Sequence, residues 1–189
     1  SFNKKIKSKK MSKQFSDLGI SIPLLNALSD LNIVTPTEIQ QKTIPLLLSN
    51  KTDFVGLAKT GTGKTAAFGL PILQLIDANS PLVQAVILAP TRELAQQIFK
   101  NLESFAQFLP EVSIAATCGG IPIKPQIERL ATPTHIVVAT PGRLIDLIQR
   151  KAINLKATKF LVLDEADEMV TILKESLDEI IAEFPATHK

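Results

Sequence analysis

The hydrophobic positions of this 189-residue chain fall into two patterns that alternate along the sequence. Short continuous apolar runs bounded by polar residues predict buried strands, and these runs cover residues 54–57, 83–88, 112–117, 136–139 and 160–163. Apolar residues spaced three and four positions apart predict helices with one buried face, which cover about residues 22–31, 38–47, 64–76, 92–108, 124–130, 142–150 and 173–184. After the first two helices, strands and helices follow one another in turn.

This alternation defines the fold class. Strands that are apolar throughout, each followed by a helix, are typical of a parallel sheet with helices on both faces. No internal repeat or low-complexity linker interrupts the pattern, and the length suits one domain with a sizeable core. The sequence therefore predicts a single α/β domain over residues 14–189, built on a central parallel sheet.

Composition limits the cellular location and the kinds of site that the protein can have. Hydrophobic residues make up 45% and charged residues 21% of the chain, as in soluble globular proteins. No apolar run approaches the roughly 18 residues of a membrane span, and no signal-peptide pattern is present. The single Cys118 cannot form an internal disulfide, and with only His135 and His188 beside it no zinc ligand set exists. We therefore expect a cytoplasmic, monomeric protein without membrane contact.

Charge is distributed unevenly along the chain. Six of the 21 basic residues lie within residues 1–13, which contain no acid, so the remainder carries 15 basic against 18 acidic residues. Residues 1–13 are either a solvated, disordered terminus or a tail that attracts nucleic acid through its phosphates. Met11 followed by Ser-Lys resembles a translation start, so residues 1–10 are alternatively an extension. We assign no function to this tail.

The strongest chemical signal is the segment 58–65, which reads AKTGTGKT and lies between a predicted strand and a predicted helix. Glycines let the backbone curl around a triphosphate, and the helix start adds unpaired N–H donors. Lys64 would reach the β- and γ-phosphates of ATP, and the Thr65 hydroxyl would hold Mg²⁺. The backbone cradle would be formed by Thr60, Gly61, Thr62 and Gly63. The alternative is a Gly-rich turn without a ligand.

Polar motifs also follow four of the predicted strands, where parallel sheets bind their ligands. They are Pro90-Thr91-Arg92-Glu93, Gly119-Gly120, Thr140-Pro141-Gly142-Arg143 and Asp164-Glu165-Ala166-Asp167. An aspartate at the end of an apolar strand suits a second Mg²⁺ ligand, which favours Asp164, and Glu165 beside it would orient or deprotonate an attacking water. The alternative for this acidic motif is a helix start favoured by the helix dipole.

The motifs after the other strands carry groups that hold sugar–phosphate backbones. Hydroxyls, guanidinium groups and helix N-termini converge there through Thr91, Arg92, Thr140 and Arg143. Such contacts carry no base information, so binding would be independent of sequence. For Thr91 and Thr140 the alternative is plain helix capping. The chain has no Trp or Tyr, which argues against a base-stacking platform.

The order and spacing of these motifs resemble the DEAD-box RNA helicases. The motifs are AKTGTGKT at 58–65, PTRELA at 90–95, Gly119-Gly120, TPGR at 140–143 and DEAD at 164–167. The segment 35–40 resembles the adenine-recognition motif of that family, and Phe15 stands at the family's spacing before it. The resemblance covers nearly the whole chain from Phe15 onward.

This resemblance implies a RecA-like P-loop domain of an RNA-dependent ATPase that separates short RNA duplexes or remodels RNA–protein complexes. It implies that Gln40 reads the adenine edge, that Phe15 helps to place that segment, and that Asp167 communicates with a downstream Ser-Ala-Thr segment. It places an RNA backbone against Pro90, Thr91, Arg92, Gly119, Gly120, Thr140, Pro141, Gly142 and Arg143.

The chain departs from the family pattern at several positions. Lys59 stands where Gln is common, Asn32 where Gly is usual, and Ile33 where an aromatic residue often contacts adenine. A Gly-Phe pair common after DEAD is missing from the segment 170–173. Because of Asn32 and Ile33, we expect weaker stacking on the adenine base.

The sequence stops at Lys189, before the Ser-Ala-Thr segment and before a second RecA-like domain with its catalytic arginines. We therefore expect an amino-terminal half that binds ATP but hydrolyses it poorly and does not unwind RNA alone. Two other functions stay open at this point: a P-loop ATPase without a role in RNA binding, and a nucleotide-gated RNA clamp without catalysis.

Overall fold

The computed structural model describes residues 14–49, 53–56 and 61–185, without the side chains of residues 172 and 173. The predictions for the tail 1–13, for Leu57 and for the loop residues 58–60, Thr60 among them, fall outside this description. None of the helices within the described ranges combines the length and apolar character that a membrane crossing needs. The elements are η1 (Phe15–Leu18), α1 (Ile22–Asp30), α2 (Glu38–Leu48), α3 (Lys64–Leu75), β1 (Ala85–Leu88), α4 (Arg92–Phe105), β2 (Ile114–Thr117), α5 (Lys124–Leu130), β3 (Ile136–Ala139), α6 (Pro141–Gln149), β4 (Phe160–Leu163) and α7 (Ala166–Ala182).

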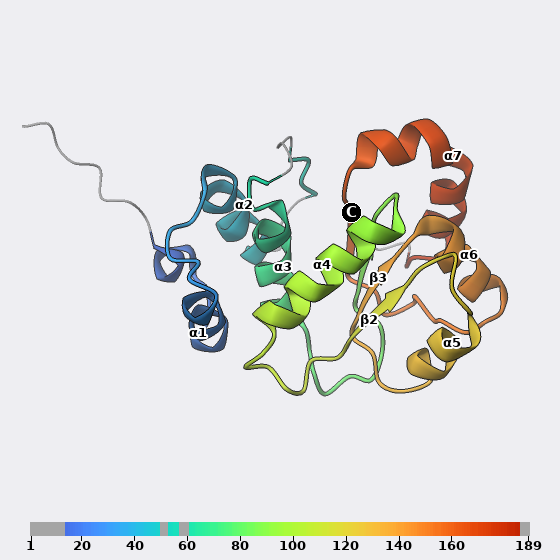
Figure 1. Ribbon diagram of the computed structural model, residues 1–189, viewed down its shortest axis with the longest axis horizontal. Helices are drawn as coiled ribbons and strands as arrows, with labels where there is room; N and C mark the ends of the chain where they lie inside the picture. The colour runs from blue at the N-terminus through green and yellow to red at the C-terminus, as the bar shows by residue number, and fades with distance from the viewer. Residues whose placement is uncertain (1–13, 50–52, 57–60, 186–189) are drawn as a thin grey trace, which may run out of the picture.

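The four strands form one sheet in the order β2-β3-β1-β4, and every pair is parallel. Ala85 at the start of β1 lies opposite Ile136 of β3 and Phe160 of β4. Because the strands are in register, their carboxyl ends lie side by side at one edge of the sheet (Figure 1). The predicted parallel α/β fold is confirmed.

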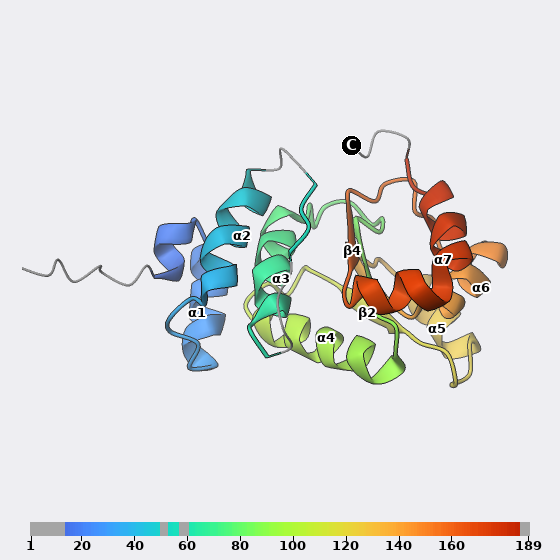
Figure 2. The same cartoon turned by 90° about the horizontal axis from the view of Figure 1, so that it is seen from above.

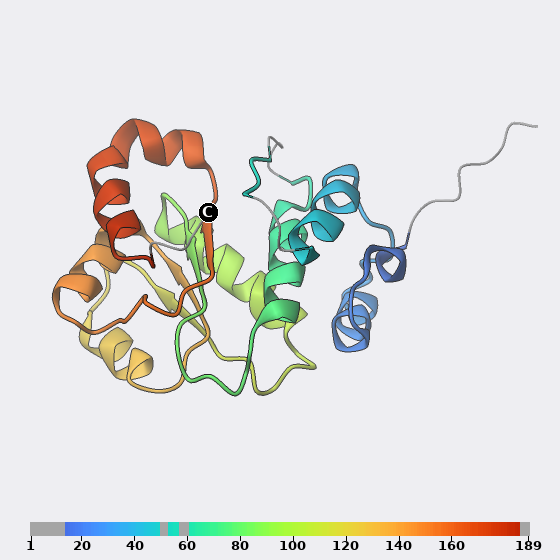
Figure 3. The same ribbon diagram turned by 180° about the vertical axis from the view of Figure 1, so that it is seen from behind.

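Alternate side chains of the sheet enter two separate cores. Ile87 and Val138 pack against α3 and α4 on one face, whereas Val86 and Val137 pack against α6 and α7 on the other. All four side chains are fully buried, and burying each one stabilises the fold by about 1.5–3 kcal/mol. Helices therefore cover both faces, as predicted (Figure 3).

The first two helices lie outside this sandwich. Helix α2 packs against α3, and α1 packs against α4, so both are separated from the sheet by those helices (Figure 2). Thr37 is the N-cap of α2 and forms a reciprocal pair of hydrogen bonds with Gln40. Gln40, in the first turn of α2, therefore lies beside the amino-terminal end of α3.

Two predicted elements differ from the structure. Residues 53–56 form no strand, and Val55 is 87% exposed, so the prediction of a buried strand at 54–57 was wrong over the described part. Apolar character alone could not establish it, because a strand also needs a neighbour, and Gly56 weakens strand formation. The last helix begins at Ala166 rather than Leu173, since Glu165 turns the chain directly into α7.

Candidate functional site

The loop before α3 has the backbone shape of an anion cradle. Gly61 and Gly63 adopt positive φ values of 79° and 84°, which glycine tolerates without strain. Gly63 is the N-cap of α3, so the unpaired N–H groups of the first helical turn begin at Lys64. A Cβ at Gly61 would meet no atom of the described residues within 4 Å, which leaves open space on that side of residues 61–63. The loop can therefore accept a phosphate group at the positive end of a helix.

Helix α2 holds this loop through two backbone carbonyls. The Thr37 hydroxyl donates to the carbonyl of Thr62 over 2.9 Å, and Gln40 Nε2 donates to the carbonyl of Gly63 over 3.1 Å. Gln40 Oε1 accepts from the Thr37 backbone N–H at 2.9 Å, and the Gln40 side chain is almost fully buried. The sequence pattern gave no indication of this bond from Thr37 to a residue 25 positions away.

Lys64 is paired with both acidic residues that the sequence selected. Its Nζ lies 3.0 Å from Glu165 Oε1 and 3.5 Å from Asp164 Oδ1. Burial alone would lower the pKa of Lys64, but the hydrogen bond to Glu165 and the charges of both carboxylates outweigh it and raise the pKa. Lys64 is therefore charged at neutral pH, and its contribution to stability is lost only as the pH rises past its raised pKa.

Asp164 and Glu165 are positioned by the end of β4. The Asp164 backbone N–H donates to the carbonyl of Leu88 at 2.9 Å, and its carboxylate accepts from the Glu165 backbone N–H at 3.1 Å. Glu165 adopts φ 53°, an uncommon value for a non-glycine residue, and is the N-cap of α7. The acidic motif is therefore a helix start as well as the partner of Lys64. Asp167 lies exposed in the first turn of α7.

The donor chemistry of this corner fits Mg²⁺. Thr65 follows Lys64 in the first turn of α3, and Lys64 Nζ lies 3.5 Å from Asp164 Oδ1, so a residue with a hydroxyl and one with a carboxylate stand on neighbouring elements. Within the described residues, no cluster of three His, Cys, Asp or Glu side chains forms a metal cage. Mg²⁺ with few protein ligands normally completes its shell with phosphate oxygens and water.

Thr91 and Thr140 make different hydrogen bonds. Thr91 Oγ1 accepts from the Leu94 backbone N–H at 3.2 Å, so it caps α4. Thr140 makes no such bond to α6, and its hydroxyl instead accepts from the Gly119 backbone N–H at 3.1 Å. This bond joins the motif after β3 to the motif after β2.

The other motif residues gather at the same edge. Gly120 has φ 76°, and a Cβ there would lie 3.3 Å from Arg92 Nη1. Arg143 Nη2 donates to the carbonyl of Ile121 at 2.8 Å. Gly142 is exposed and has open space around it, whereas Pro141 is buried and offers no surface. The predicted motifs therefore converge, and Pro90 lies half-buried beside them.

The remaining predicted positions lie in η1 and in the segment between α1 and α2. Phe15 is 3% exposed and belongs to the hydrophobic core, so its effect on a ligand can only be indirect. Asn32 adopts φ 57°, a left-handed conformation that Asn tolerates better than most residues, which explains how it replaces glycine there. Ile33 packs against the core.

Comparison with known proteins agrees with this architecture. The family model described as DEAD/DEAH box helicase matches residues 37–189. The DEAD-box ATP-dependent RNA helicase CshA of Streptococcus pneumoniae serotype 4 is 45% identical over 173 residues, which are 91% of this chain and 33% of that protein. The ATP-dependent RNA helicase DeaD of Escherichia coli K12 is 43% identical, over 93% of this chain and 28% of that protein. The chain spans about a third or less of these relatives.

Solved structures give the same result. A DEAD box protein from the hyperthermophile Methanococcus jannaschii superposes with a TM-score of 0.83 and 38% identity, over 93% of this chain and 50% of that one. A variant of Saccharomyces cerevisiae Dbp5 bound to RNA and ADP BeF3 superposes with a TM-score of 0.85 and 30% identity, over 94% of this chain and 45% of that one. The sheet and its helices therefore form a RecA-like domain of the type found in DEAD-box proteins.

Proposed function

Because the chain belongs to the DEAD/DEAH box helicase family, we propose that it is the ATP-binding part of an RNA-dependent ATPase that unwinds or remodels RNA. One observation carries the proposal. Lys64, at the start of α3, is held against Asp164 and Glu165, at the end of β4, so a phosphate cradle and two carboxylates meet in one corner. A phosphate-binding lysine and carboxylates that serve the metal and the attacking water are parts that hydrolysis of a nucleoside triphosphate requires.

In this proposal, the phosphates of ATP replace the two carboxylates as the partners of Lys64. Lys64 leaves the carboxylates and donates to the β- and γ-phosphates, and the first-turn N–H groups of α3 bind phosphate oxygens. Thr65 and Asp164 would hold Mg²⁺, which neutralises the charge that develops on the γ-phosphate when it is bound. Glu165, released from Lys64, accepts a hydrogen bond from the attacking water and takes its proton.

RNA would bind along the edge formed by the ends of β1, β2 and β3. Arg92 supplies a positive charge, and the exposed backbone at Gly120 and Gly142 lets a phosphate approach closely. A second RecA-like domain would supply further catalytic groups and would contact Asp167, so residues 1–189 alone bind ATP but hydrolyse it slowly.

The test separates this function from an ATPase that does not bind RNA. We expect the protein to crosslink to single-stranded RNA near Thr91 and Thr140 when an ATP analogue is present. We expect ATP to compete better than GTP, and we expect that preference to disappear in Gln40→Ala. Nucleotide binding that leaves RNA crosslinking unchanged, with no preference between the two bases, would contradict the proposal.

Gly142 offers a test of the RNA edge that leaves the fold intact. A Cβ at this position meets no atom within 4 Å, and the residue lies in the first turn of α6, so Gly142→Ala should leave the free energy of unfolding unchanged or raise it by up to about 1 kcal/mol. A methyl group there would still obstruct a phosphate, so we expect RNA affinity to fall about tenfold. Titration with labelled RNA and urea unfolding measure the two effects. Unchanged RNA affinity would show that RNA does not contact the first turn of α6.

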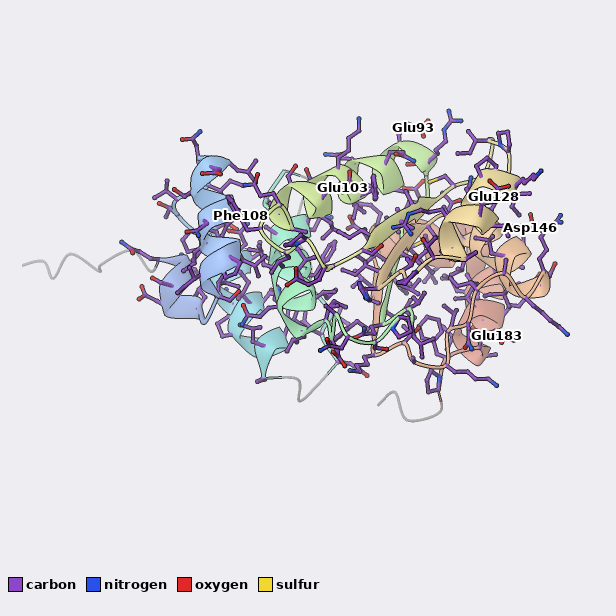
Figure 4. The ribbon with its side chains drawn as sticks, turned by 90° about the horizontal axis from the view of Figure 1, so that it is seen from below. Glu93, Glu103, Phe108, Glu128, Asp146 and Glu183 are labelled. Atoms are coloured by element: carbon purple, nitrogen blue, oxygen red, sulfur yellow. The ribbon has the colours of Figure 1, made fainter. Side chains whose placement is uncertain are left out.

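Glu93 provides a charge test on the same edge. Its Oε1 lies 3.4 Å from Arg92 Nη2, and both side chains are exposed. Glu93→Gln frees the guanidinium and removes a charge that repels phosphate, so RNA affinity should rise about two- to fivefold at low salt and less at high salt. Glu103→Gln is the matched control, because Glu103 lies on α4 far from Glu93 (Figure 4). An equal effect of both variants would show a nonspecific charge effect.

A further inference from the structure

The turn that follows β2, residues 118–122, carries the Gly119–Gly120 pair. One side chain from the helix behind it spans this turn. Gln126 of α5 directs its Nε2 to the carbonyl of Cys118 at 3.2 Å and to the carbonyl of Pro122 at 3.4 Å. The two carbonyls stand at opposite ends of the turn, so one amide group fixes the distance between its ends.

Two further side chains hold the residues between those ends. Arg143 Nη2 donates to the carbonyl of Ile121 at 2.8 Å, and Thr140 Oγ1 accepts from the Gly119 backbone N–H at 3.1 Å. Gly120 completes the turn with a left-handed backbone conformation. The turn is thus fixed from α5 and from the start of α6.

The burial of Gln126 argues against a role in packing alone. The residue is 6% exposed, and its Oε1 has no hydrogen-bond partner among the residues that the structure describes. Arg143 Nη1 is likewise buried without a partner in the described part. A buried amide with an unpaired oxygen costs stability that an apolar side chain of the same size would not. The amide does provide an N–H donor, which bonds to two carbonyls of the turn.

We propose that Gln126 is a positioning residue for RNA binding: it holds the turn 118–122 in the shape that presents Gly119 and Gly120 to a phosphate group. It acts through the turn and does not touch RNA. This inference rests on the proposed function, because it names a residue that shapes the RNA-binding edge. The alternative is that the backbone of the turn fixes its shape without help from the Gln126 amide.

The test compares two substitutions that keep the size of the side chain. Gln126→Met removes both polar atoms, and Gln126→Glu keeps the shape but replaces the donor with an acceptor. Because a shift of about 1 Å weakens a positioned contact strongly, we expect both variants to bind labelled single-stranded oligouridine about tenfold more weakly in the presence of an ATP analogue. Affinity for the nucleotide should stay within about twofold, since Gln126 lies outside the cradle. Glu128→Gln, an exposed change on the same helix, is the control (Figure 4).

Amide hydrogen exchange separates positioning from general damage. We expect faster exchange at Gly119 and Gly120 in Gln126→Met, with protection of β3 unchanged. Faster exchange throughout the sheet, or RNA affinity equal to that of the wild type, would overturn the inference while the proposed function stands. A wild-type protein that binds no RNA would overturn the proposed function and this inference together.

Discussion

Lys64→Ala is expected to lower ATP affinity by about 100-fold or more, because a triphosphate in the cradle would lose the cation that pairs with its β- and γ-phosphates. The same change leaves Asp164 and Glu165 without the cation that lies 3.5 and 3.0 Å from them. We therefore expect the melting temperature at neutral pH to fall as well, because the two carboxylates would lose their cationic partner. Fluorescent ATP titration and thermal unfolding at neutral pH measure both effects.

Two companion variants make the Lys64 result interpretable. Lys42→Ala removes the same charge from an exposed pair with Glu38, so neither ATP affinity nor stability should change measurably. Glu165→Gln removes one partner of Lys64 in the ligand-free protein, so ATP affinity should be retained or increased while hydrolysis is lost. An ATP affinity that survives Lys64→Ala unchanged would show that the nucleotide binds elsewhere.

The sequence predicted most of what depends on local pattern. Strand β3 and helix α5 were predicted with the bounds that the structure shows, because each is a short pattern bounded by clear breaks. The sequence also predicted that the acidic motif lies beside the phosphate loop, since ligand-binding motifs follow the carboxyl ends of parallel strands. It did not predict the ion pairs of Lys64 with Asp164 and Glu165.

What the sequence could not supply is contact between distant segments. The apolar character of residues 54–57 resembles that of residues 160–163, yet residues 160–163 form a strand beside β1 and the described residues 54–56 do not. Pairing depends on which edge is within reach, and no periodicity contains that information. The sequence did not predict the bond from Thr37 to the Thr62 carbonyl for the same reason. It also did not predict the hydrogen bond from Gln126 to the Cys118 carbonyl. Each is a polar side chain whose partner lies on another element.

Gly63→Ala is expected to destabilise the protein by about 2–3 kcal/mol, whereas Gly61→Ala should cost only about 1 kcal/mol. Both glycines have positive φ values near 80°, so both substitutions carry the backbone strain of a left-handed alanine. Only at Gly63 does the new methyl group collide with another residue, because its position lies 2.3 Å from Gln40 Nε2. The buried Gln40 must then move and give up its bond to the Gly63 carbonyl.

A double-mutant cycle isolates that collision. In a Gln40→Ala background the obstructing amide is absent, so Gly63→Ala should cost no more than Gly61→Ala does in the wild type. Urea unfolding of the four proteins in the cycle, with Gly61→Ala as the reference, gives the coupling free energy directly. A coupling near zero would mean that Gln40 does not restrain the loop. The loop would then owe its shape to its own glycines and to the bond from Thr37 to the Thr62 carbonyl.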